Sequence, residues 1–302
     1  MSPPRQRSAA EHAVLVQNLQ LELLADDLDP PAVSAQWSEE RLKRWFEAGG
    51  VEVKEDAPVE ADAMHELEVQ IPSAAGALHG KLLWPRGAER PPIGLCWCSA
   101  NPGKRFGAEH MDSPVPLALA AACREAALPL LRFDYSGVRG SSSDGQEYDQ
   151  SQPHHPNATA EARNAFAFLR ARGCAAIAIG GHSMGASSMM NAAATGGPFA
   201  IVSSGTAPMV GRYMPPPFRE RILADINRQV GSLPRGVPKL FIVGEADPMS
   251  PREEMERLVV IAPEPRSLET VPAARHNFEG CEAEVAQRIV RFVLRAGGRA
   301  DE

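Results

Sequence analysis

The chain has 302 residues, of which 44% are hydrophobic, and this is enough for one large core with additional material outside it. The formal net charge of −7 is spread over both signs without a basic block, so nucleic acid is not expected as a partner. No window reaches the roughly 18 apolar residues that a membrane-spanning helix needs, so no membrane span is predicted. The five cysteines have no metal-site spacing, and no metal or other cofactor is expected.

Residues 1–61 are predicted to form a helical N-terminal extension, because apolar residues recur at helical spacing over 11–25. The extension either packs on the main domain or binds a protein partner, and the pattern leaves both alternatives open. The beginning of the chain does not resemble a signal peptide, which predicts a cytoplasmic protein. A short organellar transit signal is the alternative, since Arg5 and Arg7 precede the first acidic residue.

Residues 62–302 are predicted to form one domain in which strands alternate with helices. Two segments with alternating apolar residues, 66–72 and 77–85, predict a hairpin. The later alternation indicates a mostly parallel sheet with helices on both faces. The further strands are expected at 93–98, 128–135, 175–180, 199–204, 239–243 and 267–271. The helices are expected at 117–127, 159–172, 183–194, 218–230, 252–261 and 282–295.

A strand, a tight turn and a helix follow one another around residues 176–187, with Gly-x-Ser-x-Gly at 181–185. Such a turn strains the serine backbone, and side chains at the glycine positions would collide with the neighbouring strand and helix. The turn would expose the Ser183 hydroxyl above the carboxyl ends of the strands. The helix N-terminus would favour a developing negative charge there. Ser183 is therefore the predicted nucleophile.

A general base and an acid are expected after Ser183, each in a loop that follows a late strand. Asp247 follows the apolar run at 239–243, and Glu245 is the rival carboxylate in the same loop. His276 is the only histidine C-terminal to Ser183. An imidazole takes the serine proton during attack and returns it to the leaving group, while a carboxylate orients the imidazole. His276 is therefore the predicted base and Asp247 the predicted acid.

Two backbone N–H groups are expected to form an oxyanion hole. The first belongs to Met184, the residue after the nucleophile, and the second to the loop after strand 93–98. In that loop Ser99 and Ala100 are the candidate donors, and the choice between them is left open. Two such groups would stabilise a tetrahedral intermediate.

Residues of about 207–237 are expected to form a short cap over the site. Two methionines in this segment would give an apolar acyl pocket, or they would simply pack the cap onto the core. Arg105 would meet an anionic substrate group, or it would lie at a solvated loop tip. His182 would line the pocket or pack under the turn. The residues expected around the substrate are Arg105, His182, Met209, Met214 and Phe278.

These motifs resemble those of the α/β-hydrolase superfamily, particularly its small esterases and dienelactone-hydrolase-like members. The resemblance implies the α/β-hydrolase fold, with an eight-stranded, mostly parallel sheet, helices on both faces and a short cap. The loop at 99–102 departs from the family's usual His-Gly pattern. The matching segments are 133–141 after the fourth strand, 181–186 at the nucleophile, 244–248 at the acid and 275–278 at the histidine.

The predicted function is that of a serine hydrolase that cleaves a small-molecule carboxylic ester or thioester through an acyl-enzyme. A serine peptidase, an amidase or an acyltransferase would use the same three side chains. A non-catalytic binding module on a hydrolase-like scaffold is the alternative from another class. All three triad positions are filled, and this favours an enzyme.

Overall fold

The computed structural model describes residues 63–74, 76–88, 90–103, 109–142, 155, 157–207 and 216–298, except for the side chains of 216–219 and 221. The predicted N-terminal extension and the pocket candidates Arg105, Met209 and Met214 lie outside these ranges. Their predicted roles therefore stay predictions.

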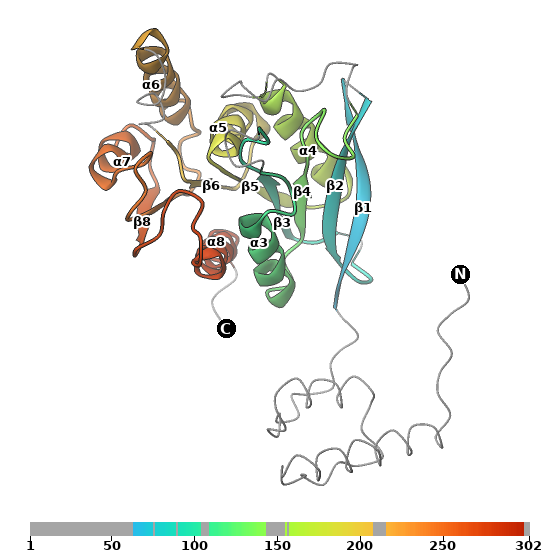
Figure 1. Ribbon diagram of the computed structural model, residues 1–302. Coiled ribbons are helices and arrows are strands. Elements are labelled where there is room, and N and C mark those ends of the chain that lie inside the picture. Colours follow the sequence, from blue (N-terminus) through green and yellow to red (C-terminus); the bar gives the residue numbers. More distant parts are fainter. Residues whose placement is uncertain are drawn as a thin grey trace, which may run out of the picture. The chain divides into compact units, whose positions relative to one another are not determined.

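An eight-stranded sheet forms the centre of the domain (Figure 1), in the order β1-β2-β4-β3-β5-β6-β7-β8. The first three strands in this order pair antiparallel, and all other neighbours pair parallel. The predicted mostly parallel sheet of eight strands is thus confirmed. The strands are β1 (Met64–Ser73), β2 (Gly76–Pro85), β3 (Ile93–Cys98), β4 (Leu130–Phe133), β5 (Ala176–His182), β6 (Ala200–Ser204), β7 (Lys239–Gly244) and β8 (Arg266–Val271).

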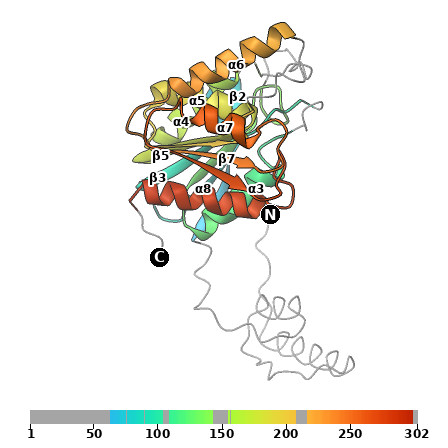
Figure 2. The same cartoon turned by 90° about the vertical axis from the view of Figure 1, so that its left-hand side faces the viewer.

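Helices cover both faces of the sheet (Figure 2). Helices α3 and α8 share one apolar cluster on one face, while α4, α5, α6 and α7 contribute to the cluster on the other. The described helices are α3 (Pro114–Glu125), α4 (Ala158–Ala171), α5 (Met184–Gly196), α6 (Pro216–Gly231), α7 (Arg252–Val259) and α8 (Glu282–Ala296). No helix in the described ranges is long and apolar enough to cross a membrane.

Strand β3 illustrates how the sequence builds these two layers. Successive side chains of a strand point to opposite faces. Leu95 and Trp97 accordingly pack in the cluster with α3 and α8, whereas Cys96 and Cys98 pack in the cluster with α4 and α5. All six residues of β3 are buried, as expected for a strand that is covered on both faces.

Several element boundaries differ from the sequence predictions, among them those of α3, β4 and β5. Helix α3 begins at Pro114, earlier than predicted, since proline is favoured in the first helical turn, where its missing N–H costs nothing. Strand β4 ends at Phe133, two residues before the predicted end, and a turn follows in which the Val138 N–H donates to the Tyr135 carbonyl (3.0 Å). Strand β5 extends to His182, which pairs with Ser204 of β6.

The parallel strands direct six connections to the same edge of the sheet. Strands β4, β3, β5, β6, β7 and β8 run in one direction, so the loops after them all leave from their carboxyl ends. In open α/β sheets this edge is where ligands bind. Every described residue of the predicted triad and oxyanion hole lies in or beside one of these loops.

Candidate active site

Ser183 occupies the sharp turn between β5 and α5 in a strained backbone conformation. Its φ is 53° and its ψ is −114°, a combination that side-chain-bearing residues rarely adopt. The Ser183 N–H donates to the carbonyl of Ser204 at 2.9 Å, so the neighbouring strand β6 holds the turn in place. The side chain is partly exposed and therefore accessible to a substrate.

The two glycines that flank Ser183 are required by close backbone contacts. A Cβ atom on Gly181 would lie 2.5 Å from the carbonyl carbon of Gly185. A Cβ atom on Gly185 would overlap the carbonyl oxygens of Cys98 and Ser99. The start of α5 can therefore lie directly against both β5 and the loop after β3 only if neither position carries a side chain.

A continuous chain of hydrogen bonds joins Ser183, His276 and Asp247. The distance from His276 Nε2 to Ser183 Oγ is 3.0 Å, and the distance from His276 Nδ1 to Asp247 Oδ2 is 2.8 Å. The His276 side chain is 12% exposed, whereas that of Asp247 is fully buried. In this geometry the carboxylate accepts from Nδ1–H, and the free Nε2 can accept the serine proton.

Backbone hydrogen bonds between the loops after β7 and β8 bring the acid and the histidine together. The Glu245 N–H donates to the Val271 carbonyl, and the Ala246 N–H donates to the Ala274 carbonyl, both at 2.9 Å. The Glu245 carboxylate instead accepts from the Ala273 N–H at 3.0 Å. Of the two candidate carboxylates, Asp247 is therefore the one bonded to His276.

The environment of Asp247 favours its ionised form. Burial by itself raises the pKa of this carboxyl. The hydrogen bond and charge of His276, together with the hydrogen bond from the Met249 N–H, lower the pKa by more than burial raises it. The net result is a pKa below the usual value, with the Met249 N–H 2.8 Å from Oδ1. An ionised acid at this position holds one imidazole tautomer and stabilises the imidazolium that forms during the reaction.

His182 and Phe278 are buried near the triad and are not exposed to an open pocket. For His182 this agrees with the second of the two predicted alternatives, whereas for Phe278 it differs from the predicted place around the substrate. His182 is 3% exposed and Phe278 is fully buried. The His182 ring centroid is 5.3 Å from that of His276 and 5.6 Å from that of Phe278. Burial, aided by the nearby His276, lowers the pKa of His182 to about 3, so this imidazole stays neutral. The His182 ring, at the end of β5, thus lies between the rings of His276 and Phe278 and supports His276 from the core.

The predicted oxyanion donors lie close to Ser183. Met184 is the first residue of α5, so its N–H has no carbonyl partner within the helix. Ser99 and Ala100 directly follow β3 and are 1% and 5% exposed. The contact between Gly185 and the Ser99 carbonyl brings this loop to the helix N-terminus.

Two supporting residues in the β6 region were missed in the sequence. The Ser204 hydroxyl lies 3.2 Å from His182 Nδ1. Gly205 has a φ of +57°, and a Cβ atom there would lie 2.6 Å from His182 Cε1. Apart from the glycine at a strand end, the sequence holds no signal for these roles, because the contacts join distant segments.

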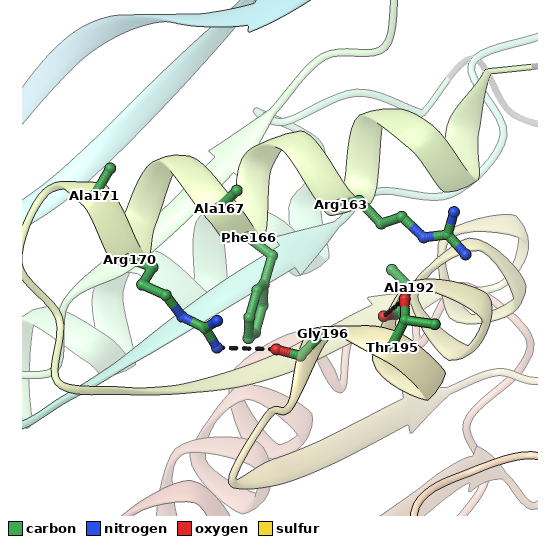
Figure 3. Close-up of a pocket in the computed structure, with 8 residues that line it drawn as sticks. All are labelled: Arg163, Phe166, Ala167, Arg170, Ala171, Ala192, Thr195 and Gly196. Carbon is green, nitrogen blue, oxygen red and sulfur yellow. Dashed lines mark hydrogen bonds between the residues drawn. The ribbon is translucent and has the colours of Figure 1, made fainter.

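Two hollows in the described part of the chain have no triad residue in their walls. The first, of about 520 Å³, lies between α4 and the last turns of α5 (Figure 3), where Arg170 donates to the Gly196 carbonyl at 2.9 Å. The second, of about 240 Å³, lies among α4, α5 and α6 and has mostly polar walls that include Ser187, Asn191 and Gln229. Within the described ranges, no group of three or more His, Cys, Asp or Glu side chains is arranged to hold a metal ion.

Comparisons with solved structures identify the fold. An α/β serine hydrolase without a lid from Xanthomonas campestris is 19% identical, with a TM-score of 0.57 over 79% of this chain and 96% of that chain. A dienelactone hydrolase from Anabaena variabilis is 19% identical, with a TM-score of 0.56 over 77% of this chain and 98% of the other. An esterase domain from Rhodothermus marinus is 17% identical, with a TM-score of 0.56 over 77% and 99%.

The sequence itself matches no protein-family model, and a comparison with curated proteins finds no match either. The chain has the α/β-hydrolase fold, as the sequence motifs predicted. At these sequence identities the similarity shows a shared fold, and the chemistry of this protein has to be inferred from the residues of its own site.

Proposed function

We propose that this protein is a serine hydrolase that cleaves a small-molecule carboxylic ester or thioester through an acyl-enzyme. The observation that carries this proposal is the hydrogen-bonded series Ser183–His276–Asp247, with distances of 3.0 and 2.8 Å. In this series Ser183 itself has a strained backbone and lies at a helix N-terminus. Solved α/β-fold structures described as esterase and dienelactone hydrolase support an ester substrate.

In the proposed first half-reaction, Ser183 Oγ attacks the substrate carbonyl carbon while His276 Nε2 takes the hydroxyl proton. The negative charge that develops on the carbonyl oxygen is stabilised by the N–H of Met184 and one N–H of the loop at Ser99 and Ala100. The intermediate then collapses, the bond to the leaving group breaks, and His276 returns the proton to the departing oxygen or sulfur.

In the second half-reaction, a water molecule gives its proton to His276 and attacks the acyl carbon. Breakdown of the second tetrahedral intermediate releases the carboxylic acid and returns the proton to Ser183 Oγ. Asp247 stays ionised throughout and stabilises the imidazolium form of His276 in both halves. No step of this cycle requires a cofactor.

The remaining parts of the proposal concern segments that lie wholly or partly outside the described residues; of the cap, residue 207 and residues 216–237, which include α6, are described. The cap at about 207–237, with Met209 and Met214, is proposed to receive the acyl group, and Arg105 is proposed to meet an anionic group of the substrate. The helical extension 1–61 is proposed as a separate segment preceding the catalytic domain 62–302, in a cytoplasmic protein. The extension stays a candidate for contact with a protein partner.

Covalent labelling with a fluorophosphonate tests the mechanism directly. The wild-type protein should carry the adduct on Ser183, mapped by mass spectrometry, and the Ser183→Ala and His276→Ala variants should not be labelled. Ser187→Ala is a matched control, because this serine lies one turn further along α5 and donates its hydroxyl to Gln229 at 2.6 Å. The control should label like wild type. Absence of labelling on Ser183 between about pH 6 and 9, a range that spans histidine ionisation, would overturn the proposal.

A further inference from the structure

Tyr135 is a fully enclosed tyrosine just after β4 that the reaction scheme above does not use. Its side chain is 1% exposed. The ring packs edge-on against Phe133, with centroids 5.3 Å apart, and it stacks on the ring of His155 at 5.4 Å. A buried phenol needs a hydrogen-bond partner, and the identity of that partner decides what the residue does.

The Tyr135 hydroxyl holds one of the two segments that carry the proposed oxyanion donors and lies beside the other. It donates to the carbonyl oxygen of Ser99 at 3.2 Å, in the loop after β3. On its other side is Ser188 of α5, whose own hydroxyl donates to the carbonyl of Met184 at 3.0 Å. The phenol therefore bonds to the loop after β3 at the place where this loop lies against the start of the nucleophile helix.

The bond to Ser99 fixes the orientation of a whole peptide group. The Ser99 carbonyl and the Ala100 N–H belong to one planar unit and point in opposite directions. The same carbonyl oxygen lies against Gly185, so close that a Cβ atom there would overlap it. With the carbonyl held between Gly185 and Tyr135, the peptide cannot rotate without leaving a buried acceptor unsatisfied.

A second set of buried contacts holds Tyr135 itself in place. The Ser136 N–H donates to the buried carboxylate of Glu161 at 3.0 Å, and the Ser136 carbonyl accepts from His155 Nε2 at 2.8 Å. Glu161 is only 1% exposed. Burial raises the pKa of Tyr135 well above its usual value, so the phenol keeps its proton and remains a donor over any ordinary assay range.

We infer that Tyr135 is a positioning residue of the oxyanion hole, which holds the Ser99–Ala100 peptide against the N-terminus of α5 in the orientation that the transition state needs. This inference rests on the proposed serine-hydrolase function. Tyr135 does not touch the substrate in this scheme. It acts through the loop, and it should affect the rate of acyl transfer more than substrate binding.

The Tyr135→Phe variant tests this role, because it keeps the ring and its stacking and removes only the hydroxyl. With p-nitrophenyl acetate, kcat should fall on the order of tenfold, less than the 10²–10³ lost when a donor itself is removed. KM should stay within about twofold, and the inhibition constant of a boronic acid that mimics the tetrahedral state should rise in parallel with the loss of kcat/KM. The pH at half-maximal rate should not move, because His276 and Asp247 are untouched.

Ser267→Ala is the matched control. Its hydroxyl also donates to one backbone carbonyl, that of Lys239 at 3.3 Å, at the opposite end of the sheet. The control should show wild-type kcat and boronic acid binding. An equal kcat in wild type and Tyr135→Phe, or an equal fall in both variants, would overturn the positioning role alone. A wild-type protein that neither turns over the ester nor labels on Ser183 would overturn the proposed function and this inference with it.

Discussion

The backbone strain at Ser183 should be measurable as a stability difference between two inactive variants. Alanine at this position keeps the Cβ atom and hence the strain at φ 53° and ψ −114°, but it removes the hydroxyl bonded to His276. Glycine also removes the hydroxyl, and it adopts a positive φ without a steric penalty. The comparison of Ser183→Gly with Ser183→Ala therefore isolates the strain from the loss of the hydrogen bond.

The size of the difference follows from two opposing effects. Relief of a strained backbone conformation stabilises the folded state by about 1–3 kcal/mol. The greater freedom of glycine in the unfolded chain offsets about 0.4–1 kcal/mol of this gain. Ser183→Gly should therefore be more stable than Ser183→Ala by about 1–2 kcal/mol. For a domain of this size, that corresponds to a rise in Tm of roughly 2–8 °C.

Urea unfolding followed by circular dichroism measures this difference, provided that the two variants show the same dependence on denaturant concentration. Both variants should fail to label with the fluorophosphonate, because neither retains the nucleophile. Equal midpoints, or a lower midpoint for Ser183→Gly, would refute the interpretation that this turn stores strain for the sake of the exposed hydroxyl.

Two further predictions concern the acid and the buried histidine. Asp247→Asn should lower kcat by roughly 10⁴-fold because the imidazole is held in the wrong tautomer. Glu245→Gln, which changes the rival carboxylate bonded to Ala273, should retain nearly all activity in the same ester assay. The pKa of His182 is lowered to about 3 in the folded state. At a pH below the ordinary pKa of histidine, the unfolded chain therefore binds a proton at this residue that the folded chain does not bind. Stability should therefore fall with decreasing pH, by about 2 kcal/mol between pH 7 and 5 in urea unfolding, and His182→Gln should lose most of that dependence.

Much of the fold was predictable because its signals are local. Alternation in 66–72 and 77–85 predicted the hairpin that β1 and β2 form. Apolar runs between helical segments predicted the parallel strands, since a strand covered on both faces must be apolar throughout. The boundaries were less accurate, as at β4, which ends at Phe133, two residues before the predicted end and just before a local turn at Tyr135.

The candidate nucleophile, acid and histidine could be selected from the order of motifs, since Gly-x-Ser-x-Gly and the two later loops each follow a strand. The sequence favoured Asp247 over Glu245, but both side chains lie in one loop and the motif order does not separate them. Only the fold shows that the Glu245 carboxylate accepts from the Ala273 N–H and that Asp247 is bonded to His276.

The sequence by itself determined the layer architecture and the residue types available for catalysis, because periodicity and turn chemistry depend on neighbours in the chain. Only the tertiary structure decided the contacts between distant segments. It buried His182 against His276 and Phe278 against His182, although both residues stand within two positions of a catalytic residue in the sequence. It also brought the Tyr135 hydroxyl to the Ser99 carbonyl, 36 positions apart. Such contacts arise from the packing of strands and helices against one another, and no short stretch of sequence encodes them.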